Sequence, residues 1–240
     1  MLGLGRMPTR NYKTIVIAAA IAALALILYV SLGRVICFAA AKFSGLDISY
    51  ERIEKWSFGE FVFDGLKVTD PKRGVGFRSS RARIGPVRDY KFPNHVTLDF
   101  KLNDIHLIMR REARPEAYDS LAGLVSVPFA ERWMYKEISG SATIFKGGVT
   151  LKDTKAVSGD IRLDLSGTFR RDNKIDMAMV ISFSDNLSAK IPEELSSVVL
   201  TEKTGGWKSL SVNLTGDFNA PSIQIASKLF RLNIRNSLRI

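Results

Sequence analysis

Side chains that commonly act in catalysis are scarce in this chain. It contains two histidines, His95 and His106, and one cysteine, Cys37. His106 lies between Ile105 and Leu107, so on a strand its side chain would point to the polar face. His95 stands at the start of another apolar alternation. We therefore expect both histidines to be solvated strand residues rather than catalytic bases.

The spacings that mark metal, phosphate or nucleophile sites are also missing from the sequence. It has no H-x-x-x-H pair, no cysteine pair, no Asp-rich calcium loop and no G-x-S-x-G elbow. Gly147-Gly148 and Gly205-Gly206 do not open helices, which predicts turns rather than phosphate loops. Glu193-Glu194 is typical of a helix start. The sequence thus predicts a protein that is not an enzyme and that binds no metal and no cofactor.

The N-terminal part of the chain contains a long apolar segment. Residues 14–32 carry no charge, and their number is close to the roughly 20 helical residues that cross about 30 Å of hydrocarbon. The preceding residues 1–13 contain Arg6, Arg10 and Lys13 and no acidic residue. The positive-inside rule therefore places 1–13 in the cytoplasm. The sequence predicts a single transmembrane helix at 14–32, with the bulk of the chain on the other side.

After the apolar run, residues 35–43 are mostly apolar or small, and Gly45 follows them. Glycine suits a helix C-terminus, so we expect a juxtamembrane helical extension at 33–45. The alternative is a cleaved signal peptide, because Ala39-Ala40-Ala41 offers an A-x-A site. Such peptides have apolar stretches of about 7–15 residues, which favours a retained anchor. Cys37 is the only cysteine, so no intrachain disulfide is expected.

Positive charge is distributed along the chain rather than concentrated. The formal net charge is +11, with 35 basic and 24 acidic residues. Residues 1–42 hold five of the basic residues and none of the acidic ones, which leaves about +6 for the remainder. A modest, dispersed bias suits a surface near anionic lipid headgroups. Nucleic-acid binding concentrates Lys and Arg on one stripe, so we expect membrane lipids and not nucleic acid as partners.

From residue 46 to residue 227 the apolar residues follow the two-residue period of strands. The clearest alternations are 96–102, 161–165 and 210–214. No long helical pattern separates successive strands, so we expect an antiparallel meander rather than a βαβ fold. Residues 175–183 are apolar on much of both faces, which predicts a central strand. Shorter strand candidates are 105–109, 142–145 and 149–151.

Three further stretches depart from the strand pattern. Residues 115–125 and 192–200 each begin with proline, which suits a first helical turn, and we expect both to be short covering helices. Residues 228–240 form a basic C-terminal tail whose spacing would place the charges on one helical face. A membrane-surface helix and a solvated helix or strand both stay open for this tail. Its basic residues are Lys228, Arg231, Arg235 and Arg239.

Two stretches share a looser pattern of glycines and alternating apolar residues. Within 43–84, an I-x-Y segment precedes Gly59, Phe61, Phe63, Gly65, Leu66, Val68 and Asp70. Residues 210–223 read LSVNLTGDFNAPSI, a strand followed by glycine, proline and a final apolar position. These segments resemble the opening and closing parts of AsmA-like proteins, which also begin with a membrane helix. The chain would be a minimal-length member, since AsmA and TamB relatives are usually much longer.

The resemblance implies a bacterial inner-membrane protein whose periplasmic β-domain spans 46–227. That domain would be a curved antiparallel sheet, a groove or a sandwich, with one or two short covering helices. The family is associated with phospholipid traffic and envelope assembly, so we expect phospholipid acyl chains to lie against inward-facing residues. The candidates are Phe100, Leu163, Leu165, Met177 and Met179.

One alternative to the lipid groove stays open. The alternating apolar faces could pack as a closed core instead of lining a groove. The protein would then be a non-catalytic assembly or secretion scaffold, similar in plan to LptC-like or type II secretion N-like proteins, and would act through other envelope proteins.

Overall fold

The structure is a computed structural model, and it describes residues 45–57, 60–71, 74–91, 95–109, 118, 120–130, 133–218, 220–226 and 231–235. The chain divides into two units, Met1–Gly45 and Leu46–Ile240. The predicted transmembrane segment at 14–32 and nearly all of its extension at 33–45 lie outside the described residues. Within the described part, no helix has both the length and the apolarity needed to cross a bilayer.

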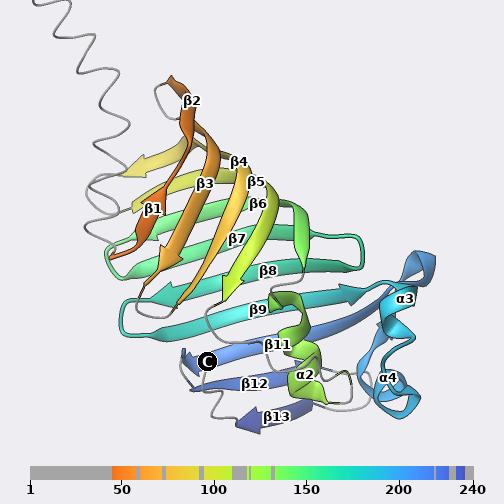
Figure 1. Ribbon diagram of the computed structural model, residues 1–240. Helices are drawn as coiled ribbons and strands as arrows, with labels where there is room; N and C mark the ends of the chain where they lie inside the picture. Colours follow the sequence, from red (N-terminus) through yellow and green to blue (C-terminus); the bar gives the residue numbers. More distant parts are fainter. Residues whose placement is uncertain are drawn as a thin grey trace, which may run out of the picture. The chain divides into compact units, whose positions relative to one another are not determined.

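The unit from Leu46 onward is built on one antiparallel sheet with thirteen strands in its described residues (Figure 1). The order along the sheet is β1-β3-β4-β5-β6-β7-β8-β9-β11-β12-β13, while β2 also pairs with β3 and β10 with β11. Neighbours in the sheet thus largely follow chain order, which confirms the predicted antiparallel fold. The strands are β1 (Asp47–Ser49), β2 (Arg52–Ser57), β3 (Glu60–Asp70), β4 (Val75–Lys91), β5 (His95–Met109), β6 (Met134–Phe145), β7 (Gly148–Val157), β8 (Ile161–Arg170), β9 (Lys174–Phe183), β10 (Thr201–Glu202), β11 (Lys208–Asp217), β12 (Ala220–Ala226) and β13 (Arg231–Arg235).

Strand β9 shows how the alternation in the sequence becomes two different faces. Its residues Ile175, Met177, Met179, Ile181 and Phe183 are all buried. Of the four residues between them, Asp176 and Ala178 are exposed and Val180 and Ser182 are half-buried. β9 pairs with β8 on one side and with β11 on the other, so the predicted central position is confirmed.

Short helices and 3-10 turns lie between strands at three points in the described part of the chain. They are α2 (Leu121–Ser126), the 3-10 turn η1 (Val127–Phe129), α3 (Asp185–Ser188), α4 (Glu193–Val199) and the 3-10 turn η2 (Thr204–Gly206). The helix predicted at 192–200 is confirmed as α4. The helix predicted at 115–125 begins later, at Leu121, because Ser120 is its N-cap. The Ser120 hydroxyl accepts a hydrogen bond from the Gly123 N–H at 3.1 Å.

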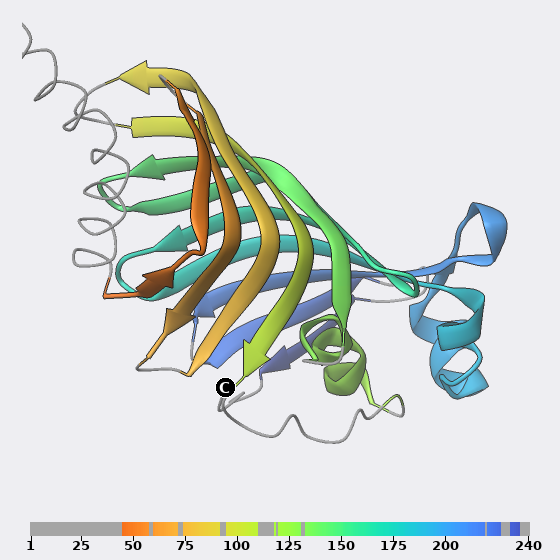
Figure 2. The ribbon, with the colours of Figure 1, turned by 45° about the horizontal axis from the view of Figure 1, so that its top comes forward.

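The sheet curls, so that the same face of β5 and of β9–β12 meets in one core (Figure 2). Ile105, Ile181 and Leu210 are fully buried in that core. Leu124 of α2 and Val127 of η1 pack into the same cluster, so this short helical segment covers part of the curled sheet. We call the face that carries Ile105, Ile181 and Leu210 the inner face, and the opposite one the outer face.

Four neighbouring strands carry one extra residue at the same level of the sheet. Same-face residues of a regular strand are two or four positions apart, but here inward-facing residues on either side of this level are three apart. Because each strand inserts one residue, the pairing continues without a shift. We call this level the insertion line. It separates the row Phe63, Ala82, Leu102 and Ile138 from the row Leu66, Ser79, Ile105 and Tyr135.

The insertion line corrects one expectation from the sequence. The alternations at 96–102 and 105–109 are not two strands but one, β5. The backbone absorbs the extra residue at Asp104, whose φ is 48°. The wholly buried Ser79 hydroxyl accepts the Asn103 N–H at 3.2 Å and lies 2.7 Å from the Asn103 carbonyl oxygen. This side chain therefore satisfies backbone groups next to the interruption.

The basic tail is a strand in its described part. Residues 231–235 form β13 and pair with β12. The helix considered for this tail, with its basic residues on one face, is therefore not formed by these residues. The flanking residues 228–230 and 236–240 lie outside the described residues.

Candidate functional site

The five residues proposed from the sequence to contact lipid lie on the inner face, in three adjacent cross-strand rows. Phe100, Leu165 and Met179 belong to the middle row, because Leu165 pairs with Met179 and the row continues through β7 and β6 to Phe100. Leu163 lies one row nearer to α2, and Met177 lies one row farther away. The structure therefore brings all five together on one face.

Burial divides these five residues into two groups. Leu163, Met177 and Met179 are only 7%, 4% and 2% exposed, so other protein atoms already cover them. Phe100 and Leu165 are half-buried. Only Phe100 and Leu165 therefore offer apolar surface that a ligand could cover without displacing protein.

The most accessible part of the inner face lies in a row that the sequence did not single out. Ile144 of β6 is 48% exposed. Its row includes Val96, Val149 and Phe169, which are half-buried, and the buried Ile175. The next row inward carries only apolar residues and glycine. Its members are Leu98, Ala142, Leu151, Gly167 and Met177.

These two rows present no charged side chain, so they suit an uncharged, flexible aliphatic ligand better than a polar one. The strand predicted at 142–145 contains Ile144, so the sequence did indicate the strand that carries this surface. Its exposure could not be read from the sequence, because exposure depends on which distant segments cover the row.

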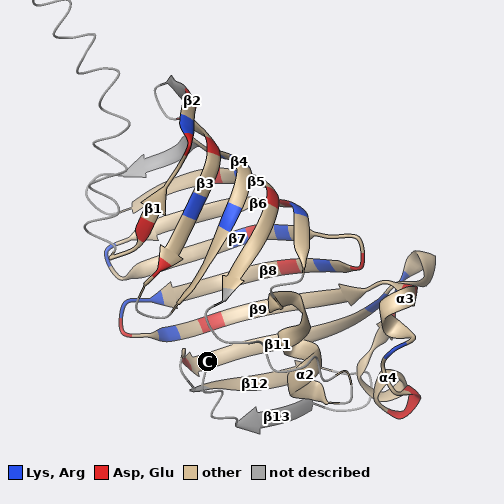
Figure 3. Cartoon of the chain, viewed as in Figure 1, with Lys and Arg blue, Asp and Glu red and all other residues tan. Residues whose placement is uncertain are grey.

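The outer face has a different chemistry, with oppositely charged residues beside one another on neighbouring strands (Figure 3). Arg52 contacts Asp64 at 2.9 Å. Lys101 contacts Glu137 at 2.7 Å, and its hydrogen bond is the main cause that lowers the pKa of the Glu137 carboxyl. A further pair is Arg83 with Glu60 at 3.3 Å. Such pairs of opposite charge across strands stabilise a sheet modestly.

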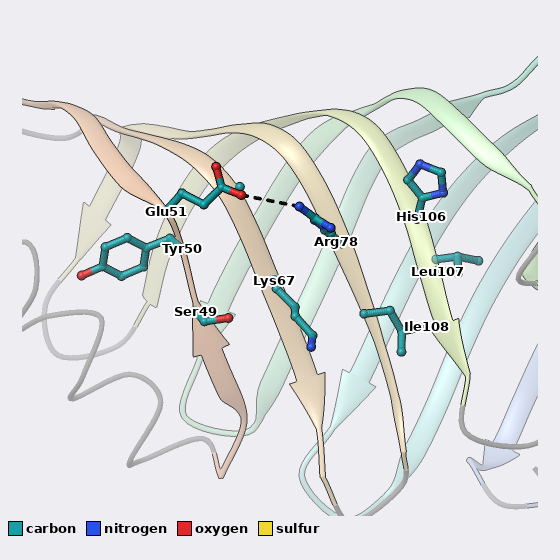
Figure 4. A pocket seen from close by; sticks show the side chains of 9 residues that line it. Ser49, Tyr50, Glu51, Lys67, Arg78, His106, Leu107 and Ile108 are labelled. Atoms are coloured by element: carbon teal, nitrogen blue, oxygen red, sulfur yellow. Dashed lines mark hydrogen bonds and ion pairs between the residues drawn. The ribbon is translucent and has the colours of Figure 1, made fainter.

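A pocket of about 640 Å³ opens on the outer face of β1, β3, β4 and β5 (Figure 4). Lys67, Arg78 and His106 are direct cross-strand neighbours there, and all three are exposed. Glu51 reaches Arg78 at 3.5 Å. The full lining is Ser49, Tyr50, Glu51, Gly65, Lys67, Arg78, His106, Leu107 and Ile108.

The insertion line borders this pocket at Gly65 of β3. The chain leaves β1 and enters β2 at Tyr50 and Glu51, opposite the inserted Gly65 of β3. The Glu51 side chain lies over Gly65, because a Cβ atom there would be 2.5 Å from Glu51 Cδ. Gly65 also has a φ of 62°, which favours glycine.

His106 lies on the outer face, as the alternation predicted, and His95 is half-buried at the start of β5. In the part of the chain that the structure describes, no three His, Cys, Asp or Glu residues gather in a way that could hold a metal ion. No family model, curated protein or solved structure matches this chain. Its function is therefore inferred from the two surfaces described above.

Proposed function

We propose that this protein is a minimal AsmA-like protein of the bacterial inner membrane that binds or transfers phospholipid acyl chains along its inner face. The observation that carries this proposal is the charge-free row of Val96, Ile144, Val149 and Phe169, in which Ile144 is 48% exposed. An aliphatic chain on this row would remove apolar surface from water without leaving any buried polar group unpaired.

The energetics of such binding need no specific polar contact. Each CH₂ group that is buried contributes about 0.8 kcal/mol, so several methylene groups along the half-exposed rows would hold a chain reversibly. This mode of binding also requires no nucleophile, base or metal. It is consistent with a sequence in which the residue types for catalysis are few.

The uncharged segment at 14–32 supplies the rest of the proposal. As a transmembrane helix with a basic cytoplasmic flank, it would keep the β-domain at the periplasmic surface of the bilayer. A lipid that leaves the bilayer would then have a short path to the sheet.

The scaffold alternative keeps some support from burial. Leu163, Met177 and Met179 are covered by the protein's own atoms, as a closed core requires. In this second function the domain would present its outer surface to other envelope proteins. The protein would then be a scaffold similar in plan to LptC-like or type II secretion N-like proteins.

Native mass spectrometry of the full chain, extracted gently in detergent and followed by lipid extraction, separates the two functions. We expect phospholipid at a reproducible ratio to the protein. A lipid-free protein that carries a stoichiometric protein partner would contradict lipid binding and support the scaffold.

A further inference from the structure

The pocket on the outer face holds two bases that are less well neutralised than the bases around them. Arg83 and Lys101 are also directly opposed across β4 and β5, but each of them contacts an acid, at 3.3 Å and 2.7 Å. In the pocket, Lys67 of β3 lies directly opposite Arg78 of β4. Like charges at directly opposed positions destabilise a sheet, and a bound anion would offset that repulsion.

The acid that lines the pocket neutralises this charge only weakly. Glu51 meets Arg78 at 3.5 Å, and the two side chains are 70% and 62% exposed. Exposed pairs with this geometry contribute little, because water and salt screen them. The Arg78 guanidinium can therefore exchange Glu51 for another anion at small cost.

The side chains of the pocket match the donors that a phosphate group needs. Arg78 offers a planar fork of N–H donors and Lys67 a compact ammonium group. In Figure 4 both side chains lie with His106 on the same side of the sheet, and Ile108 also lines the pocket. Ser49 adds a hydroxyl to the lining. The volume of about 640 Å³ leaves room beyond one phosphate group for an organic portion against Ile108.

We infer that this pocket binds a phosphate-bearing ligand, with Lys67 and Arg78 as its charged contacts and Glu51 as a competitor for Arg78. The phosphate could belong to a lipid headgroup or to a small soluble phosphomonoester. The inference does not rest on acyl-chain binding, since the pocket is on the opposite face of the sheet.

The test is a titration of the full chain, in neutral detergent micelles, with sn-glycerol 3-phosphate and with inorganic phosphate, followed by ³¹P NMR and calorimetry. A second arm measures binding of the protein to vesicles of phosphatidylcholine alone or with phosphatidylglycerol. Saturable binding in the first arm identifies a soluble phosphate ligand. Binding only to the phosphatidylglycerol vesicles identifies a headgroup.

The variants decide whether the pocket is responsible. Lys67→Gln with Arg78→Gln should weaken binding about tenfold or more, because two charge-assisted hydrogen bonds are lost. Glu51→Gln should strengthen it severalfold. The control, Lys152→Gln with Lys155→Gln, makes the same charge change at exposed positions of β7 and should change affinity less than about twofold.

Two outcomes would overturn the inference. One is no binding in either arm, and the other is an equal loss in the pocket variant and the β7 control, which would indicate unspecific attraction to a basic protein. Thermal unfolding of each variant shows whether it is folded. If the double variant does not fold, Lys67→Gln alone is used, since the Lys67 side chain is exposed and its loss leaves no cavity.

Discussion

Ile144 and Met134 lie near opposite ends of β6 and point to opposite faces of the sheet, although both side chains are almost half exposed, at 48% and 46%. Ile144 is paired with the inward-facing Val96, and Met134 with the outward-facing His106. One strand thus carries two exposed apolar residues of similar size, of which only one faces the proposed acyl-chain surface.

This pair gives a matched test of lipid binding. We expect Ile144→Asp to reduce the phospholipid that copurifies with the protein by about tenfold, because a carboxylate on this row would have to be desolvated by an acyl chain. Met134→Asp makes the same change on the outer face and should leave the bound lipid unchanged. Lipid extraction and mass spectrometry of both variants measure the ratio, and equal loss in the two would argue against the inner face as the site.

Asp substitutions at the more deeply buried candidates should act on folding instead. Met179 is 2% exposed and lies in the core cluster. We expect Met179→Asp to lower the free energy of unfolding by more than about 3 kcal/mol, since it buries an unpaired carboxyl and removes packing. Circular dichroism during thermal unfolding checks this. A Met179→Asp protein with wild-type thermal stability would show that the core is less closed here than the burial indicates.

The hydrogen bond between Tyr135 and Pro128 ties β6 to the segment that covers the inner face. The buried Tyr135 hydroxyl donates to the Pro128 carbonyl oxygen at 2.6 Å. Tyr135→Phe should cost about 1–3 kcal/mol, because it leaves a buried carbonyl group without a donor. Chemical denaturation of the two proteins measures the difference, and a change below about 0.5 kcal/mol would show that water or another donor replaces the hydroxyl.

The same tyrosine predicts a sensitivity to alkaline pH. Burial raises the pKa of the Tyr135 hydroxyl, so the folded chain keeps a proton that the unfolded chain releases above about pH 10. The stability that this group contributes is fully present below that pH and is lost as the pH rises further. We expect the stability of the wild-type protein to fall more steeply above about pH 10 than that of Tyr135→Phe. Parallel slopes in thermal unfolding across this range would contradict the prediction.

A substitution at Gly167 tests the close approach of β8 to β9 on the inner face. Its φ is 147°, and a Cβ atom would lie 2.2 Å from the Asp176 carbonyl oxygen. Gly167→Ala should therefore destabilise the fold by more than the roughly 1–2 kcal/mol expected from an unfavourable φ alone. Gly205→Ala is the control, because Gly205 also has a positive φ but has nothing within 4 Å of the added carbon. Equal unfolding temperatures for the two variants would contradict the steric argument.

The strand pattern was predictable because it depends on local periodicity, and the antiparallel order because no long helical pattern separates successive strands. An apolar residue at every second position fixes which side chains share a face within one strand. This was enough to place Leu163 with Leu165 and Met177 with Met179, to set His106 on the polar face, and to identify α4 from Pro192 and the acidic residues that follow it.

Tertiary structure decided which of those residues are accessible. Phe100 and Leu163 carry the same signal in the sequence, yet Leu163 is covered and Phe100 is half-buried. The distance of a row from α2 does not decide this, since Met179 is 2% exposed in the same row as Phe100. The curl of the sheet decides which residues of a row are covered by distant segments. No local pattern contains that information.

The outer pocket depends on tertiary structure for the same reason. By itself, the sequence determined the alternation of each strand and the residue types available to each face. Lys67, Arg78 and His106 lie on three successive strands, and the register of β3 with β4 and of β4 with β5 makes them neighbours. A local pattern fixes the face on which a side chain lies, whereas its partners are fixed by the register between strands and its exposure by the segments that fold over it.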